Sequence, residues 1–248
     1  MKTVAFTVAD KNNTNYAENL RKTFNRFHPD IEFKIYGDDY CQKSLGQDKQ
    51  FFFKQKPWIM KELIEDYDLV IGFDADSYVT GKLDFILDGG YEVGVVNNFS
   101  NMDIGNYGVV TTLNIAPQVY LNCGLVATTS KRFVNHWWNL CSNQELFNSF
   151  RYREQDLLNI ICYYGDYIVS NFDLTGASFY GLSGKDLWSE AVVKNNQLVV
   201  EFVDDKGKVV LTRPIKVIHV AGGNTPNKME LDKYFKEESY RFIKSLYE

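Results

Sequence analysis

The sequence predicts an α/β protein in which a mixed, mostly parallel sheet is flanked by helices. Along the first half of the chain, short runs rich in β-branched and aromatic residues alternate with longer segments of helical periodicity. Such alternation predicts strand-helix-strand units, which place helices on both faces of a largely parallel sheet. One apolar run, residues 69–73, ends in two carboxylates, Asp74 and Asp76. Because ligands bind beyond the carboxyl ends of strands in such sheets, this run predicts a functional strand.

The first elements follow from periodicity and turn chemistry. Residues 3–8 (TVAFTV) form a short apolar run typical of a buried strand. Residues 16–27 place their apolar side chains on one helical face, and Asn15 and Glu18 have the spacing of a capping box. A second strand is predicted over residues 31–37.

The next helix is predicted over residues 54–67, with Pro57 at its first turn, where the missing N–H of proline costs nothing. The functional strand at residues 69–73 follows it. Two further strands are predicted over residues 91–96 and 119–129, and two helices over residues 131–141 and 153–164.

The chain changes character after about residue 181. Turn signals at residues 195–196 and 205–207 separate alternating runs, which predicts a small antiparallel meander near residues 190–213. A short core strand then carries His219. The amphipathic segment at residues 229–248 predicts a C-terminal helix docked on the protein.

Composition and charge narrow the classes of function. The 248 residues carry a net charge of -5 and no cluster of Lys and Arg, which argues against nucleic acid as a partner. The four cysteines lack the spacing of a metal site or a disulfide framework, which favours reduced thiols and a cytoplasmic location. No signal peptide or apolar run of about 18 residues is present. We therefore expect no transmembrane segment and, at most, peripheral contact with a membrane.

The pair Asp74 and Asp76 has two interpretations. Carboxylates one residue apart can converge on one Mg²⁺ or Mn²⁺ ion, which then completes its ligand shell with substrate phosphate oxygens. Alternatively, Asp76 caps the following turn and Asp74 merely ends the strand. The rest of the chain must decide between a site for a metal-bound diphosphate and a turn.

Several motifs follow one another along the chain: the polar turn after the first strand (FTVADKNNTNY), the D-x-D strand (FDADS), an N-x-G strand (YLNCGLV), an acid-Gln-Asp helix start (REQDLLN) and a late strand ending in histidine (VIHVAGG). In this order they resemble the motifs of the retaining glycosyltransferases of the glycogenin and lipopolysaccharide galactosyltransferase type, glycosyltransferase family 8. The resemblance implies one domain of the GT-A fold over residues 1–248. It divides this domain into a nucleotide-binding half at about 1–98, a sugar and acceptor half at about 99–228 and a C-terminal helix at about 229–248.

The resemblance also implies a metal site. Asp74, Asp76 and His219 would ligate a divalent cation, Mn²⁺ or Mg²⁺. An imidazole beside two carboxylates suits Mn²⁺ better than an all-oxygen Mg²⁺ site. The cation would neutralise the departing nucleoside diphosphate of a sugar donor.

The remaining site residues are implied by their places in the same motifs. The donor, expected to be a UDP-sugar, would be held by Thr7, Ala9, Asp10, Lys56, Asn122, Gly124, Gly222 and Lys228. The family carries a lysine six residues after the histidine, where this chain has Thr225, and the nearest candidate is Lys228. The family's arginine on the helix before the D-x-D strand is also missing, and Lys54, Lys56 or Lys61 would substitute for it. Glu154 and Gln155 lie where the family contacts the transferred sugar, and we expect them to carry catalysis together with Asp74 and Asp76.

The sequence leaves more than one possibility for the acceptor, for the stereochemistry and for the class of reaction. The acceptor is expected to be a carbohydrate or another hydroxyl compound. Retention of configuration is implied by the resemblance; if configuration is inverted, the general base would be one of Asp103, Asp173 and Asp186. The alternative function is a haloacid-dehalogenase-like phosphatase with Asp74 as nucleophile and Asp76 as general acid.

Overall fold

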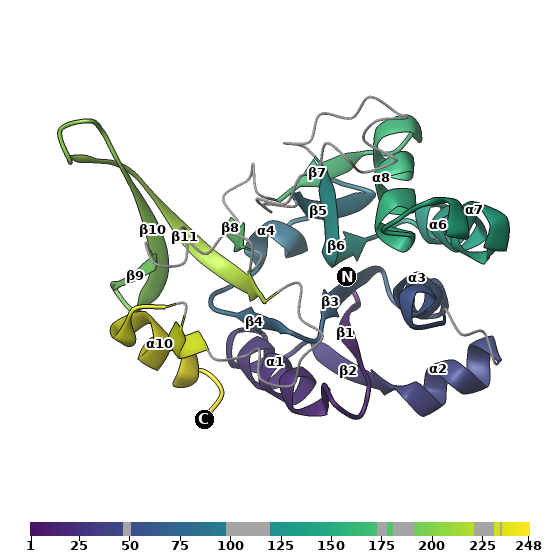
Figure 1. The fold of residues 1–248 in the computed structure, drawn as a ribbon, viewed down its shortest axis with the longest axis horizontal. Helices are drawn as coiled ribbons and strands as arrows, with labels where there is room; N and C mark the ends of the chain where they lie inside the picture. Colours follow the sequence, from purple (N-terminus) through teal and green to yellow (C-terminus); the bar gives the residue numbers. More distant parts are fainter. Residues whose placement is uncertain (47–50, 98–119, 173–177, 181–190, 221–230, 234) are drawn as a thin grey trace.

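The computed structural model describes residues 1–46, 51–97, 120–172, 178–180, 191–220, 231–233 and 235–248 (Figure 1). Its strands are β1 (Thr3–Ala9), β2 (Glu32–Gly37), β3 (Leu69–Asp74), β4 (Ser77–Val79), β5 (Val93–Asn97), β6 (Leu121–Thr128), β7 (Val169–Asn171), β8 (Ser178–Tyr180), β9 (Ala191–Lys194), β10 (Gln197–Val203) and β11 (Val209–His219). Its helices are α1 (Thr14–Phe27), α2 (Asp38–Leu45), α3 (Phe51–Leu63), α4 (Asp84–Leu87), α6 (Lys131–Ser142), α7 (Gln144–Ser149), α8 (Glu154–Tyr164) and α10 (Glu237–Lys244), with a 3-10 turn, η4, at Leu231–Lys233. None of the helices in these ranges combines the length and the apolar character that crossing a membrane requires.

The main sheet has six strands in the order β2-β1-β3-β6-β5-β7. Only β6 runs antiparallel to its neighbours, and the other pairs are parallel. The predicted mixed, mostly parallel sheet is therefore confirmed. Because β6 is reversed, its first residues lie at the same edge as the carboxyl ends of β1 and β3, which brings residues distant in sequence to one edge.

Helices cover both faces of the main sheet, as the alternation of strands and helices predicted. β1 shows the arrangement: Val4 and Phe6 pack with α3, α6 and α8, whereas Ala5 packs on the other face with α1 and α4. The period of two along the strand divides its apolar side chains between the two cores. Strands buried on both faces explain why the sequence shows continuous apolar runs.

A second sheet has the order β4-β11-β10-β9, and β8 pairs with β11. It contains the predicted meander, in which Asn195 and Asn196 form the first turn with positive φ angles. The last run of the meander and the strand that carries His219 were expected to be separate. They form one strand of 11 residues, β11, which belongs to this second sheet and not to the main one. In Figure 1 the β10-β11 hairpin extends away from the rest of the molecule.

Three local predictions are wrong. Asn15 and Glu18 form no capping box, because α1 begins at Thr14 and Glu18 pairs with Arg21 instead. Pro57 lies inside α3, which extends back to Phe51 because the helix continues through the aromatic run before it. The C-terminal segment is not one helix over residues 229–248: the part that is described forms η4 and then α10, which begins at Glu237.

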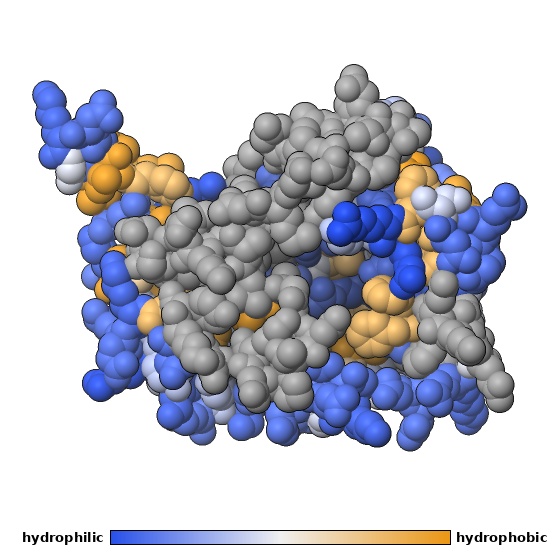
Figure 2. Space-filling model, in the orientation of Figure 1, coloured by the Kyte–Doolittle hydropathy of each residue, from blue (hydrophilic) through white to orange (hydrophobic). Residues whose placement is uncertain are grey.

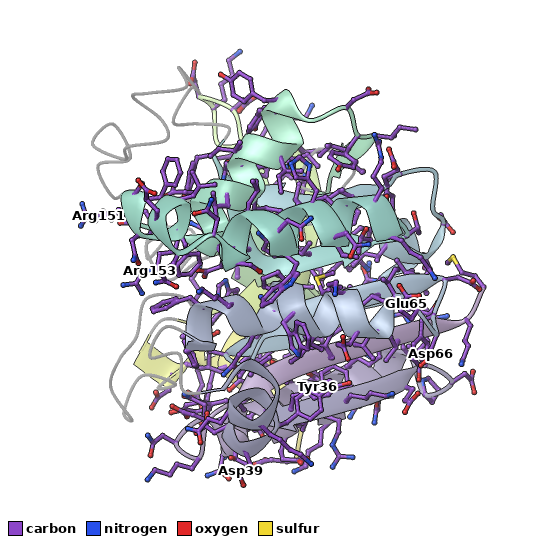
Figure 3. All side chains as sticks on the ribbon, turned by 90° about the vertical axis from the view of Figure 1, so that its right-hand side faces the viewer. Tyr36, Asp39, Glu65, Asp66, Arg151 and Arg153 are labelled. Carbon is purple, nitrogen blue, oxygen red and sulfur yellow. The ribbon has the colours of Figure 1, made fainter. Side chains whose placement is uncertain are left out.

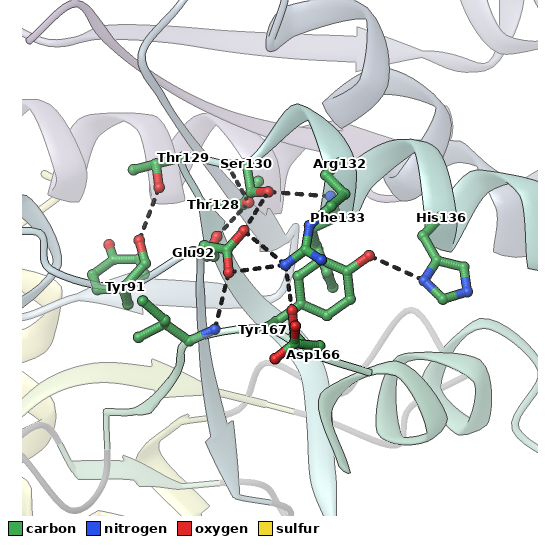
Figure 4. A network of polar contacts seen from close by, with 11 residues as sticks. Tyr91, Glu92, Thr128, Thr129, Ser130, Arg132, Phe133, His136, Asp166 and Tyr167 are labelled. Carbon is green, nitrogen blue, oxygen red and sulfur yellow. Dashed lines mark hydrogen bonds and ion pairs between the residues drawn. The ribbon is translucent and has the colours of Figure 1, made fainter. Parts of the chain in front are cut away.

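A polar network ties the start of β5 to α6 and to the segment before β7 (Figure 4). The Glu92 carboxylate accepts hydrogen bonds from the Ser130 hydroxyl, from the Ile168 amide and from the Arg132 guanidinium. The Arg132 guanidinium also lies 4.2 Å from the centre of the Tyr167 ring. These bonds lower the pKa of Glu92, chiefly through the Ile168 amide, so the carboxylate is ionised when it joins the three segments.

Replacing Glu92 with alanine is expected to lower the free energy of unfolding by about 1–3 kcal/mol, because several donors lose one common acceptor. Glu65 provides a matched control, since its bridge to Lys131 lies between two exposed side chains. Its replacement with alanine is expected to change stability by less than about 0.5 kcal/mol. Urea unfolding of both variants measures the difference, and equal effects would mean that the network contributes no more than a surface ion pair.

Candidate functional site

Two aspartates and one histidine meet at the carboxyl end of β3. Asp74 is the last residue of β3, Asp76 lies two residues beyond it, and His219 is the last residue of β11. The Nε2 atom of His219 lies 3.2 Å from Oδ2 of Asp74 and 3.2 Å from Oδ1 of Asp76. One ligand atom of each residue lies within 4.8 Å of those of the other two. The three residues predicted to hold a cation are therefore together in the structure.

Strand pairing fixes this cluster. β4 begins at Ser77, directly after the aspartates, and pairs antiparallel with β11 so that Ser77 lies opposite His219. The Val220 amide donates a hydrogen bond of 2.9 Å to the carbonyl of Asp76. The aspartate turn is thus attached to the end of β11 by backbone bonds, which do not depend on the side chains themselves.

The cluster has the donor set of a divalent-cation site. Two carboxylates and one imidazole suit Mn²⁺, and also Mg²⁺ if water completes the shell. The His219 side chain is 4% exposed, whereas those of Asp74 and Asp76 are 37% and 32% exposed. A cation held here would be bound by a buried imidazole and by two partly exposed carboxylates, so substrate oxygens could reach it from the solvent. The residues present therefore fit a divalent cation.

Lys56 bonds one carboxylate oxygen of Asp74, and His219 lies near the other. The Lys56 ammonium on α3 donates hydrogen bonds of 2.5 Å to Oδ1 of Asp74 and 2.5 Å to the carbonyl of Cys123. Burial opposes both charges, but the Lys56 charge holds the pKa of Asp74 well below its usual range, and Asp74 raises the pKa of Lys56. The salt bridge thus keeps Asp74 ionised and leaves its Oδ2 atom directed at His219.

Close packing restricts the His219 ring. A Cβ atom built on Gly124 would lie 2.4 Å from Cε1 of His219 and 2.7 Å from Oδ1 of Asn122. The Gly124 amide donates a hydrogen bond of 2.6 Å to that Asn122 oxygen. Burial opposes a charge on His219, but Asp76 and Asp74 outweigh it and raise its pKa to about 9. Without a cation, His219 carries a proton at neutral pH, and a bound cation would replace that proton.

The first turn of α8 is joined to the first residues of β6. The Cys123 amide donates to Oε1 of Gln155 at 3.1 Å. One turn further along α8, Asn159 exchanges two hydrogen bonds with the backbone of Leu121, at 2.8 and 2.9 Å. These contacts place Glu154 and Gln155 beside the strand that carries Asn122.

Glu154 is held with its carboxyl group turned inward. Its carbonyl accepts a hydrogen bond of 3.0 Å from Nε1 of Trp137, and Oε1 lies 3.9 Å from Sγ of Cys123. Burial, supported by the nearby Asp74 charge, raises the pKa of Glu154 to about 8. Among the described residues, its buried Oε2 atom has no hydrogen-bond partner. A neutral carboxyl group with one oxygen available can donate a hydrogen bond to a ligand.

Solved structures share the fold of this chain. The galactosyltransferase LgtC, in complex with donor and acceptor sugar analogs, matches with a TM-score of 0.56 and 15% identity, over 97% of this chain and 95% of that chain. An active-site mutant of LgtC matches with a TM-score of 0.61 and 16% identity, over 98% and 94%. A glycosyltransferase involved in the glycosylation of the major capsid of PBCV-1 gives 0.53 and 12%, over 93% and 97%. The chain has the GT-A fold.

No protein-family model and no curated protein sequence matches the chain. The GT-A fold thus appears here with a sequence far from those of the structures it resembles. What the site does has to be argued from its own residues.

Three of the residues expected to hold the donor, Thr7, Ala9 and Asp10, lie at the end of β1 in this GT-A chain. The Thr7 hydroxyl is buried and donates a hydrogen bond of 3.0 Å to the carbonyl of Phe73. Oδ1 of Asp10 accepts hydrogen bonds from the amides of Asn12 and Asn13, at 3.0 and 2.9 Å. Both side chains therefore stabilise the protein around the site. Ala9 ends the strand and is buried.

Several predicted residues lie outside the part of the chain that the structure describes. They are Gly222, Lys228, Asp103, Asp173 and Asp186. The predictions for them stay predictions.

Sequence reasoning missed three features of the site. Ser77 is buried opposite His219, but β4 is too short to be predicted from three residues. Cys123 lies between Asn122 and Gly124, with its thiol near Glu154. The N-x-G pattern gives no indication of this contact, because Cys123 occupies its variable position. Arg153 takes a backbone conformation that its side chain gives no reason to expect.

A pH-dependent stability is expected from Glu154. The folded pKa of about 8 lies above the ordinary value of 4.5, so the folded protein holds this proton more tightly than the unfolded chain does. Stability from this group is full below about pH 4.5 and is lost as pH rises through about 8. Glu154→Gln removes the titration. Melting temperatures are measured without metal at about pH 5 and about pH 8.5, and the melting temperature of the variant should rise relative to that of the wild type at the higher pH. A difference that is the same at both pH values would contradict the burial of this carboxyl group.

Proposed function

We propose that the protein is a metal-dependent glycosyltransferase that transfers a hexose from a UDP-sugar to a hydroxyl acceptor, with retention of configuration. The observation that carries the proposal is the cluster of Asp74, Asp76 and His219 at the carboxyl end of β3. In an α/β sheet this is where ligands bind. Supporting it are the fold shared with LgtC, which is a galactosyltransferase, and the group of Glu154 and Gln155 beside the same edge.

The protein's own groups have distinct tasks in this reaction. Asp74, Asp76 and His219 would hold Mn²⁺ or Mg²⁺, which when bound supplies positive charge for the leaving diphosphate. Lys56 orients Asp74 and keeps it ionised. The side-chain oxygen of Asn122 accepts a hydrogen bond from the Gly124 amide, which holds Asn122 close to the His219 ring.

The sugar would lie toward α8. Glu154 is neutral near pH 7 and offers a hydrogen-bond donor, while Gln155 is fixed through the Cys123 amide. Fixed donors and acceptors orient a sugar because its hydroxyl groups need partners of both kinds. If configuration is retained, the departing phosphate can take the proton of the acceptor hydroxyl, and no separate general base is needed. We place the reaction in the cytoplasm, where the free thiols of Cys123, Cys141 and Cys162 would stay reduced.

Direct assay tests the proposal. Nucleoside-diphosphate sugars, each with Mn²⁺, Mg²⁺ or EDTA, are incubated with the protein, and release of UDP or another diphosphate is followed by chromatography. Metal-dependent release from one UDP-sugar is the expected result, and NMR of the transferred anomeric centre reports retention or inversion. Hydrolysis of p-nitrophenyl phosphate without any release from sugar nucleotides would instead support the phosphatase alternative.

A further inference from the structure

Two arginines and two phenylalanines lie together at one end of α3 and just before α8. Arg151 is exposed and Arg153 partly exposed; Arg153 directly precedes Glu154 in the chain, and Arg151 lies three residues before it. Phe52 and Phe53 on α3 are 49% and 40% exposed. The Arg153 guanidinium lies 4.3 Å from the centre of the Phe53 ring, and that ring packs edge-on against Phe52 at 5.7 Å. We call Arg151, Arg153, Phe52 and Phe53 the arginine rim.

The arginine rim lies at one end of the molecule. Figure 3 shows Arg151 and Arg153 side by side at one end of the molecule, while the acidic Glu65 and Asp66 lie at the opposite end. In Figure 2, strongly hydrophilic and hydrophobic side chains lie next to each other around a hollow on the right of the face shown. A cationic and aromatic surface in a chain of net charge -5 calls for an explanation.

Arg153 occupies a strained position. Its φ of 46° and ψ of -109°, with the 2.9 Å bond from the Gln155 amide to the Tyr152 carbonyl, form a type II′ turn whose first central residue is usually glycine. Every other described residue with positive φ is a glycine or an asparagine. A non-glycine residue in this conformation costs on the order of 1–3 kcal/mol, and such strain is concentrated at functional sites. The strain therefore directs attention to the Arg153 side chain.

The guanidinium groups are oriented but keep their hydrogen-bond donors available. In the described part of the chain, neither Arg151 nor Arg153 forms an ion pair; their contacts are with aromatic rings, Tyr152 at 5.4 Å for Arg151 and Phe53 for Arg153. Stacking on a ring restrains a guanidinium while its N–H groups stay free to bind a carboxylate or a phosphate as a fork. Two such forks form a site for an anion.

The position of the rim assigns the anion to one substrate. Arg153 is joined by one peptide bond to Glu154, and the charges of Arg153, Lys56 and Asp74 all act on the Glu154 carboxyl group. Lys56 bonds both Asp74 and the Cys123 carbonyl, and the Cys123 thiol contacts Glu154, which is next to Arg153 in the chain. This series of contacts therefore leads from the metal ligands to the rim. The donor diphosphate would lie at the metal end of this series. A group at the other end belongs to the molecule that meets the transferred sugar from outside.

We propose that the arginine rim binds a carboxylate or phosphate group of the acceptor, so that the enzyme glycosylates an anionic carbohydrate. The assignment of the anion to the acceptor rests on the proposed function, whereas anion binding by the rim can be tested without it. Phe52 and Phe53 would pack against the apolar face of the acceptor ring while the arginines hold its charge.

Calorimetric titration tests the proposal with three acceptor-like probes that differ in charge. Methyl β-D-glucuronide carries a carboxylate, glucose 6-phosphate a phosphate, and methyl β-D-glucoside neither. With UDP and Mn²⁺ present, we expect at least one anionic probe to bind about 10-fold more tightly than the neutral glucoside, and Arg153→Gly to remove that preference. Arg153→Gly relieves the backbone strain, so the variant is expected to fold at least as stably as the wild type.

Controls separate the rim from net charge and from the donor site. Arg241→Gln removes an exposed positive charge on α10, far from the rim in the sequence, and is expected to change nothing. Affinity for UDP with Mn²⁺ should stay within about 3-fold in Arg153→Gly, whereas a parallel loss would assign the arginine to the donor. Equal binding of charged and neutral probes, or no binding of either anion, would overturn the inference. Failure of UDP to bind while an anionic probe still does would overturn only the proposed donor.

Discussion

Replacing Asp76 with asparagine is expected to reduce the rate of sugar transfer by at least about 10³-fold. The change removes one of two carboxylates from the cluster and leaves Asp74 already bonded to Lys56. A cation that stabilises the leaving diphosphate supplies several kcal/mol, and each 1.36 kcal/mol corresponds to about a factor of ten in rate. The rate is measured as UDP released at saturating donor and Mn²⁺.

The fold should survive this change. The Asp76 carbonyl still accepts from the Val220 amide, and β4 still pairs with β11, so the melting temperature of metal-free Asp76→Asn should stay close to that of the wild type. Asp66→Asn is the matched control, because Asp66 is exposed in the connection between α3 and β3, at the end of the molecule opposite Arg151 and Arg153 (Figure 3). Equal activity of the two variants would exclude Asp76 as a ligand.

Adding one methyl group at Gly124 is expected to lower activity by about 10–100-fold, mainly through loss of metal affinity. The new Cβ of Gly124→Ala would lie 2.4 Å from the His219 ring and 2.7 Å from the Asn122 side chain. Both distances are far below normal contact, and His219 is buried, so the ring must leave the position in which Nε2 faces the two aspartates. Calorimetric titration with Mn²⁺ measures the loss.

Gly37→Ala controls for the general effect of a methyl group on a glycine at a strand end. A Cβ there meets nothing within 4 Å, so unfolding should be unaffected. If Gly124→Ala binds Mn²⁺ as tightly as the wild type, His219 is not a ligand in the geometry described. If both activity and metal affinity fall while the melting temperature holds, the packing of His219 is confirmed as the cause.

The main sheet could be predicted because its strands are buried on both faces. Residues 3–8 and 69–73 carry no charged side chain and are mostly apolar, and they became β1 and β3 with nearly the same bounds. Their burial made the sequence pattern strong. The grouping of Asp74, Asp76 and His219 was also expected, but only through the order of motifs in a resembling family.

Other features could not be predicted because their causes are not local. β4 is three residues long and exists because it pairs with β11, over 130 residues away in the chain. Lys56 was expected at the donor only through the resemblance, and its bond to Asp74 could not be predicted because it forms only when the fold brings α3 beside the end of β3. Arg153 has no glycine-like sequence signal for a turn that glycine usually occupies, so only the structure shows its strain.

Thermal stabilisation by UDP, with and without Mn²⁺, tests the central claim most directly, because it asks whether the aspartates and His219 hold a metal that binds a diphosphate. The account predicts that UDP raises the melting temperature of the wild type only when Mn²⁺ is present, and that Asp76→Asn abolishes this shift. No shift in the wild type with any nucleoside diphosphate, or a metal-independent shift that survives Asp76→Asn, would contradict it.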